Sequence, residues 1–369
     1  MTPPIAQAPP KDRSGPMPGA LGAFLSRFYA LAINYRNRRF DRGRGVIRFD
    51  RPVISVGNLS VGGTGKTPLV QHLIRLLRAN GRWPAVAMRG YRSPQGQGLK
   101  SDEAQTYLDE FPTLPIVAQP DRASGLIQLF STEQGEKIDS IILDDGFQHR
   151  RIGREVDLVL VDATRSPFES SLLPRGWLRE PVQSLARASA VIITHAEAAS
   201  PEKLLSLRAQ IQAVAPGAAL ASCSHAWSGF ALHRATAHPE PKHLNWLEFQ
   251  RVFAACAIGN PGAFFEQARR LCPQVVGTHA YRDHHDFLQT EIDTLSLAVK
   301  ASGADVLLVT AKDWAKLRAL SLRGVPVAVP TLEMQWHQGG ESIESMVLAA
   351  RVPDEDAPEA PARDVAPAR

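Results

Sequence analysis

The sequence has few cysteines and no long apolar run. Its three cysteines (Cys223, Cys256 and Cys272) are too few and too scattered for a disulfide framework or a zinc knuckle. The most apolar long stretch, residues 19–33, contains Arg27 and is shorter than the ~20 residues that cross a bilayer. The proline-rich beginning of the chain has no apolar segment typical of a secretory signal. We therefore expect a protein of a reducing compartment with no membrane span.

Positive charge is concentrated near the beginning of the chain. The formal net charge is only +5, but residues 19–51 contain eight arginines and two aspartates. Apolar residues at helical spacing in 21–35 precede most of these arginines. This pattern predicts an amphipathic basic helix over 19–45, either in a membrane interface or packed on the protein as an ordinary helix. We expect no nucleic-acid partner and identify no protein partner.

Short apolar runs alternate with helical patterns along most of the chain. The runs are continuously apolar, which favours a parallel sheet covered on both faces. They form two series, and two βα series predict two α/β domains. We expect disordered tails at 1–18 and 352–369, a larger α/β domain at 46–230 and a smaller one at 231–351. The predicted strands are 53–56, 85–88, 116–118, 138–143, 156–161, 190–194, 252–258, 275–276, 306–310 and 325–329.

A glycine-rich turn lies between the first predicted strand and a helix. It consists of Ser60, Val61, Gly62, Gly63, Thr64, Gly65, Lys66 and Thr67. The glycines leave backbone N–H groups free to surround phosphate oxygens, and the following helix directs its positive end at them. Lys66 would reach the β- and γ-phosphates, and Thr67 would hold Mg²⁺. Ser60 replaces the glycine that usually opens this motif, yet the strand–turn–helix context predicts a P-loop that binds a nucleoside triphosphate.

Two carboxylates follow the predicted strand 138–143. In a P-loop protein, an acid at the end of a neighbouring strand completes the Mg²⁺ shell. Asp144 and Asp145 fill this position, and we prefer Asp145 as the ligand, although the sequence leaves open which of the two touches the metal. The expected fold is therefore a P-loop NTPase-like parallel sheet domain with a second, smaller α/β domain and an N-terminal amphipathic helix.

Three kinds of P-loop protein were compared with the sequence. A GTPase should have Asp-x-x-Gly and Asn-Lys-x-Asp motifs, and neither is present at the expected spacing. A partition-type membrane-cycling ATPase should have a further lysine where Val61 stands, but otherwise shares the glycine spacing. That reading stays open as the alternative to a small-molecule kinase.

Several motifs together resemble the tetraacyldisaccharide 4'-kinase family. They occur in the order of the family and extend over about residues 20–335. They are residues 57–68, Arg89-Gly90-Tyr91, Asp102-Glu103, 143–149, 178–181, 258–261, Asp283-His284 and 310–313. The resemblance implies a kinase that uses ATP and Mg²⁺ to phosphorylate the 4'-hydroxyl of a lipid A disaccharide precursor. It also implies peripheral attachment to the cytoplasmic face of the bacterial inner membrane.

The resemblance implies roles for individual residues as well. Asp102 would act on the acceptor hydroxyl, with Glu103 beside it and His149 orienting it, although a His–Asp pair could instead take the proton. His284, in the second domain, would close over nucleotide or acceptor. Besides Lys66, the remaining expected active-site residues are Arg179 as a catalytic residue and Tyr91, Arg122 and Glu180 as substrate-binding residues. Ser101 and Ala104 depart from the Gly and Pro that usually flank the Asp-Glu pair.

Overall fold

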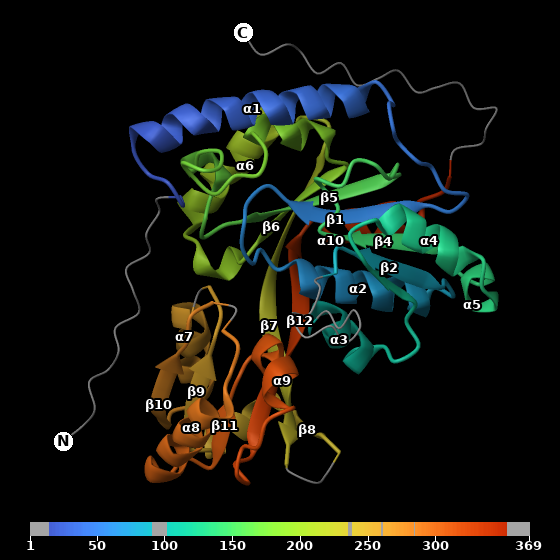
Figure 1. Ribbon diagram of the computed structural model, residues 1–369. Helices are drawn as coiled ribbons and strands as arrows, with labels where there is room; N and C mark the ends of the chain where they lie inside the picture. Colours follow the sequence, from blue (N-terminus) through green and yellow to red (C-terminus); the bar gives the residue numbers. More distant parts are fainter. Residues whose placement is uncertain (1–14, 91–101, 235–237, 260, 284, 353–369) are drawn as a thin grey trace. The chain divides into compact units, whose positions relative to one another are not determined.

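The computed structural model describes residues 15–90, 102–234, 238–259, 261–283 and 285–352, without the side chains of Asp102 and Glu103. The predicted disordered tails lie largely outside these residues. The chain divides into two compact units (Figure 1). The first, which we call the P-loop unit, comprises Arg13–Ser101, Thr113–His225 and Met334–Arg369. The second unit includes Asp102–Pro112 and Ala226–Glu333.

The P-loop unit contains a parallel sheet whose strands are almost entirely buried. Its strand order is β7-β6-β5-β1-β4-β2-β3, and neighbouring strands are parallel. Because parallel strands have their carboxyl ends at one edge, the segments after β1, β4, β5 and β6 meet there. The strands are β1 (Val53–Asn58), β2 (Pro84–Met88), β3 (Ile116–Ala118), β4 (Ser140–Asp144), β5 (Val156–Asp162), β6 (Ala190–Thr194) and β7 (Ala219–His233).

Helices of this unit begin and end at residues suited to those positions. Ser200 caps α6 through its hydroxyl, and Asp121 caps α4 through its carboxylate. Helix α2 ends before Gly81, which has a φ of 74°. The buried side of α2 consists of apolar residues from Leu69 to Leu77. The helices are α1 (Ala20–Asp41), α2 (Lys66–Ala79), α4 (Arg122–Phe130), α5 (Glu133–Glu136), α6 (Pro201–Val214) and α10 (Gly340–Leu348), with 3₁₀ turns at Pro167–Glu169, Val182–Arg187 and Ala196–Ala198.

The second unit has its own α/β core. Its strand order is β10-β9-β11-β12-β7, and β8 pairs with β7 in the antiparallel direction. Apolar clusters include Phe230, Phe264 and Phe265 in one and Ile292, Leu307 and Val327 in another. Its elements are α3 (Asp102–Glu110), β8 (Glu240–His243), a 3₁₀ turn (Leu244–Phe249), β9 (Val252–Cys256), α7 (Pro261–Leu271), β10 (Val275–Ala280), α8 (Gln289–Ala301), β11 (Val306–Leu308), α9 (Ala311–Leu317) and β12 (Val327–Gln338).

The expected parallel α/β architecture is confirmed, but the observed division differs from the expected boundaries. Helix α3 belongs to the second unit, where Arg318 binds Asp109 at 3.0 Å. Residues from Met334 belong to the P-loop unit, where Glu344 of α10 accepts a hydrogen bond from Trp336 and lies 2.8 Å from His72 of α2. The boundaries near residues 225 and 333 fall inside two long strands, β7 and β12. The interrupted apolar pattern of residues 219–233 did not indicate a strand as long as β7.

Candidate active site

The P-loop connects β1 to α2 and is held by a second segment of chain. The N–H of Val61 donates to the carbonyl of Trp177 at 2.8 Å, and the N–H of Arg179 donates to the carbonyl of Leu59 at 2.7 Å. Gly62 and Gly65 have φ values of 117° and 82°, which only glycine adopts without strain. The loop conformation and the position of Arg179 are therefore set by the same backbone pairing.

Asp145 lies between two cations beside the P-loop. Its carboxylate accepts a hydrogen bond from Arg179 Nη1 at 2.7 Å, and Lys66 Nζ lies 3.4 Å from its other oxygen. Burial by itself raises the pKa of Asp145, but the charges of Lys66, Arg179 and Arg122 outweigh it and hold this pKa below its usual value of 3.8. Asp145 is thus an anion at neutral pH, and its Oδ1 is buried without a hydrogen-bond partner in the described part of the chain.

Further polar side chains, which the sequence reasoning did not single out, fix this arrangement. Asn58 Oδ1 lies 3.3 Å from Lys66 Nζ and accepts its hydrogen bond. Gln148 donates to the carbonyl of Asn58 at 2.9 Å. A Cβ built on Gly62 would lie 3.8 Å from Arg165 Nη1, so this guanidinium reaches the loop. Asn58 is the last residue of β1, the strand that leads into the P-loop. This position is the feature of the sequence that could have identified Asn58.

His149 is largely enclosed and lies among arginines. Burial, followed by the charges of Arg122, Arg154 and Arg151, lowers its pKa from 6.5 to about 4. Its backbone carbonyl accepts a hydrogen bond from Arg154 at 2.7 Å. The imidazole is therefore neutral at physiological pH.

Two residues expected to bind substrate are buried instead. Arg122 is 3% exposed, and its Nη1 donates to the carbonyl oxygens of Asp144 and Asp145 at 2.9 and 3.2 Å. Glu180 is 0% exposed, and its Oε2 accepts hydrogen bonds from Asn37 at 2.9 Å and Arg187 at 3.0 Å. Neither side chain reaches solvent here: Arg122 supports the Asp144–Asp145 turn, and Glu180 joins α1 to the segment that carries Arg179.

Other expected site residues fall in different places. Asp102 and Glu103 begin α3, but the structure does not describe their side chains. Tyr91 and His284 lie outside the described residues altogether. Thr64 is buried, and its carbonyl accepts a hydrogen bond from Thr194 at 3.0 Å. Ser60 forms a β-bridge with Leu178, and Thr67 lies in the first turn of α2.

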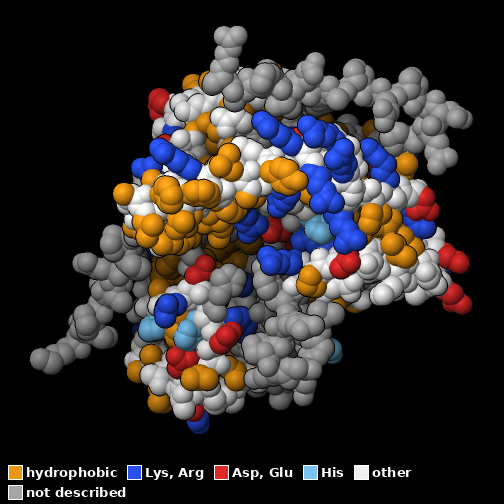
Figure 2. Space-filling view, turned by 45° about the horizontal axis from the view of Figure 1, so that its top comes forward, with side chains coloured by type: hydrophobic (Ala, Val, Ile, Leu, Met, Phe, Trp, Pro, Cys, Tyr) orange, Lys and Arg blue, Asp and Glu red, His pale blue; other side chains and the backbone are white. Residues whose placement is uncertain are grey.

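One face of helix α1 packs on the rest of the P-loop unit, and the opposite face is exposed. Ser26 and Tyr29 bond to the carbonyls of Leu172 and Arg179 at 3.0 and 2.9 Å. The opposite face is apolar, and its residues are each more than half exposed: Leu21, Phe24, Phe28, Leu31 and Tyr35. Figure 2 looks toward this side of the molecule and shows a broad hydrophobic area with lysine and arginine side chains beside it. None of the helices in the described part of the chain is long and apolar enough to span a bilayer.

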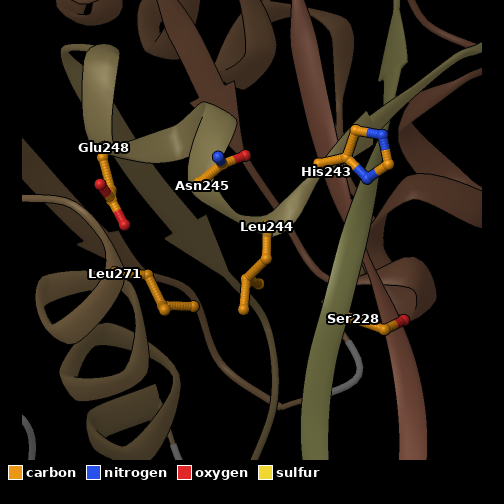
Figure 3. A pocket seen from close by; sticks show the side chains of 6 residues that line it. All are labelled: Ser228, His243, Leu244, Asn245, Glu248 and Leu271. Atoms are coloured by element: carbon orange, nitrogen blue, oxygen red, sulfur yellow. The ribbon is translucent and has the colours of Figure 1, made fainter.

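An open surface pocket of about 570 Å³ lies in the second unit (Figure 3). Its lining comprises Ser228, His243, Leu244, Asn245, Glu248 and Leu271. It contains none of the candidate active-site residues. We assign it no role in the chemistry.

Comparison with known proteins agrees with this geometry. The family profile described as tetraacyldisaccharide-1-P 4'-kinase matches residues 20–350. The tetraacyldisaccharide 4'-kinase of Geobacter sulfurreducens is 35% identical over 336 residues, covering 86% of this chain and 89% of the relative. That of Bdellovibrio bacteriovorus is 32% identical over 311 residues, covering 80% and 88%.

Among solved structures, LpxK from Aquifex aeolicus in complex with ATP is similar throughout. Its TM-score is 0.66 at 26% sequence identity, and the match covers 88% of this chain and 97% of that one. The residues that the family profile matches include the P-loop, the Asp144–Asp145 turn and Arg179, and both relatives cover most of the chain. The chain therefore belongs to the tetraacyldisaccharide-1-P 4'-kinase family.

Proposed function

We propose that this chain transfers the γ-phosphate of ATP to the 4'-hydroxyl of a tetraacyldisaccharide 1-phosphate, a lipid A precursor, on the cytoplasmic face of the inner membrane. The main observation behind this proposal is that Asp145 lies between Lys66 and Arg179 beside the P-loop. Family membership favours this reading over a partition-type ATPase.

The donor atoms present at the P-loop fit Mg²⁺. Asp145 offers an ionised oxygen with no hydrogen-bond partner among the described residues, and Thr67 offers a hydroxyl at the beginning of α2. The described residues contain no group of three or more His, Cys, Asp and Glu side chains placed to hold a metal, so phosphate oxygens and water would complete the shell. Bound Mg²⁺ would neutralise charge on the β- and γ-phosphates.

The chain's own residues bind and orient the triphosphate. The N–H groups of residues 62–67 surround the phosphates, and Lys66 would leave Asp145 to contact the β- and γ-oxygens. The guanidinium of Arg179 faces the same point and would stabilise charge that develops on the transferred group. Arg122 keeps the turn that carries Asp145 in place.

Proton removal requires a base at the acceptor hydroxyl. We assign this role to Asp102, at the beginning of α3, with His284 and Tyr91 contributing to the acceptor site and Glu103 beside the base. His149, whose imidazole is neutral, would orient Asp102. Arg122 and Glu180 act as positioning residues in this proposal.

Exposed apolar side chains on α1 and adjacent arginines suit a membrane interface that contains anionic lipids. The acyl chains of the substrate would remain in the bilayer while its sugar reaches the P-loop. We therefore place the protein on the membrane surface as a peripheral enzyme.

The test is transfer of labelled phosphate from ATP to tetraacyldisaccharide 1-phosphate in detergent micelles. Lys66→Ala and Asp102→Ala should each abolish transfer, but only Lys66→Ala should strongly weaken ATP binding, because Asp102 is assigned to the acceptor. The exposed Lys137 provides a matched control, and Lys137→Ala should leave both unchanged. Absence of transfer by the folded wild-type chain, with ATP hydrolysis stimulated by a partner protein, would instead support the partition-type ATPase.

A further inference from the structure

A cluster of polar side chains lies beside the P-loop, on the opposite side of β1 from Asp145. In the sheet order, β4 is one neighbour of β1, and β5 and β6 follow on its other side. Asp162 ends β5 and Thr194 ends β6, where the two residues are paired in register. His195 follows Thr194, and His225 comes from β7, the next strand.

Distances connect this cluster to the loop itself. Thr194 donates its hydroxyl hydrogen to the carbonyl of Thr64 at 3.0 Å. The ring of His225 covers Gly65 so closely that a Cβ there would lie 2.1 Å from Cε1. The rings of His225 and His195 are 5.1 Å apart between centroids, in an edge-to-face arrangement. The two imidazoles therefore form a wall next to the residues that hold the phosphates.

His195 is held in a defined position. Its Nδ1 lies 3.3 Å from Asp162 Oδ1, an oxygen that also accepts hydrogen bonds from the N–H and hydroxyl of Thr164 at 2.8 and 2.7 Å. The backbone of His195 has a φ of 53°, an uncommon conformation for a residue other than glycine. Its side chain is 31% exposed, so the ring retains an accessible face.

Three atoms beside the loop have unused hydrogen-bonding capacity. Within the described residues, His195 Nδ1, His225 Nε2 and Thr64 Oγ1 are buried and form no hydrogen bond, although His195 Nδ1 lies 3.3 Å from Asp162 Oδ1. Buried polar atoms are usually paired, and an unpaired one requires an explanation such as a missing ligand. Thr64 belongs to the P-loop itself, and the ring of His225 covers Gly65 of the same loop.

The orientation of the triphosphate follows from Lys66 and Asp145. Lys66, at the beginning of α2, pairs with Asp145, which follows β4, and the two groups mark the end that holds the terminal phosphate. The remainder of a nucleotide must then extend across the loop toward β5 and β6, outside the carboxyl ends of the strands. This direction leads to His195 and His225.

We infer that Asp162, His195 and His225 form the subsite for the nucleoside part of the bound triphosphate. A planar base can stack on the accessible face of the His195 ring, and the imidazole nitrogens can bond its polar edge or the ribose hydroxyls. Asp162 acts as a positioning residue by holding His195. This inference rests on the proposed binding of ATP and adds how its nucleoside is recognised.

The experiment compares ATP with inorganic tripolyphosphate, which has no nucleoside. Binding of each, in the presence of Mg²⁺, is measured by calorimetry on the full chain. His195→Ala should weaken ATP binding about tenfold, which is the size expected for one lost ring contact and hydrogen bond, and should change tripolyphosphate binding less than about twofold. In the transfer assay, the same variant should raise the KM for ATP with little change in kcat.

Two variants define the outcomes. Lys66→Ala should weaken the binding of both compounds, and the exposed His337→Ala should weaken neither. Equal losses for both compounds in His195→Ala would show a structural effect on the P-loop and overturn the inference, as would unchanged ATP binding. Failure of the wild-type chain to bind ATP or to transfer phosphate would instead count against the proposed function.

Discussion

Asn37 donates a hydrogen bond from its side-chain amide to the carboxylate of Glu180 at 2.9 Å, and the acceptor is fully buried. Glu180 also binds Arg187 and lies 3.6 Å from Arg36, while Tyr29 donates to the carbonyl of Arg179. Helix α1 is thus attached to Arg179, the residue that precedes Glu180. Arg179 in turn pairs with Asp145. The helix has a structural role in the active site as well as an exposed apolar face.

Replacing Glu180 tests this attachment. Glu180→Gln keeps the shape but removes the fully buried charge that pairs with the partly buried guanidinium of Arg187, so we expect a loss of about 2–4 kcal/mol in the free energy of unfolding. Urea denaturation measures it. Glu341→Gln, at an exposed position, should change stability by less than about 0.5 kcal/mol. A variant of Glu180 that is as stable as the wild type would contradict the structural role.

The exposed face of α1 can be changed without touching its packed face. Phe24 and Phe28 lie 4.9 Å apart between ring centroids. The double variant Phe24→Ser/Phe28→Ser should reduce binding to vesicles that contain anionic phospholipid by about tenfold or more, because two aromatic side chains no longer enter the interface. ATP binding should be unchanged. Phe249→Ser removes a ring of the second unit that is more exposed than Phe24 and Phe28, and the proposal fails if both changes affect vesicle binding equally.

Asp145 should determine the dependence on Mg²⁺. Asp145→Asn keeps an oxygen at the site but removes its charge, so we expect half-maximal phosphate transfer to require about tenfold more Mg²⁺. Titration of transfer rate against Mg²⁺ at saturating ATP provides the measurement. Asp50→Asn, at an exposed surface ion pair, is the control. An unchanged Mg²⁺ requirement in Asp145→Asn would remove this residue from the metal site.

Gly65 should not tolerate a side chain. Its φ of 82° makes Gly65→Ala unfavourable by about 1–2 kcal/mol, and the added Cβ would also meet the ring of His225. We expect lower stability and weaker ATP binding, measured by thermal unfolding and calorimetry. Adding His225→Ala should recover the steric part of the stability loss but leave the backbone part. No recovery in the double variant would show that the ring is not the obstacle.

The low pKa of His149 predicts a dependence of stability on pH. With a pKa of about 4 when folded and 6.5 when unfolded, the imidazole takes up its proton mainly in the unfolded chain between these values. This residue therefore makes stability decrease as pH falls from 6.5 toward 4. The difference in unfolding free energy between pH 7 and pH 5 should be smaller in His149→Gln than in the wild type. An identical difference would mean that His149 titrates alike in both states.

Local sequence was sufficient for the parts of the site whose geometry depends on neighbouring residues. The glycines of residues 62–65 and the cap of α2 follow from backbone conformations that few other residues adopt, and the Asp144–Asp145 turn follows directly from its strand. The amphipathic pattern of residues 21–35 likewise predicted a helix, which is found over Ala20–Asp41. The family motifs then identified the kinase.

Tertiary structure decided which charged residues face solvent and which are buried. Sequence could not show that Glu180 meets Asn37 or that Arg122 binds the carbonyls of Asp144 and Asp145, because these partners are 143, 22 and 23 residues apart. It could not bring His195 next to His225, or place α3 in the second unit, for the same reason. Such contacts depend on strand order and packing, which short-range propensities and spacing do not determine.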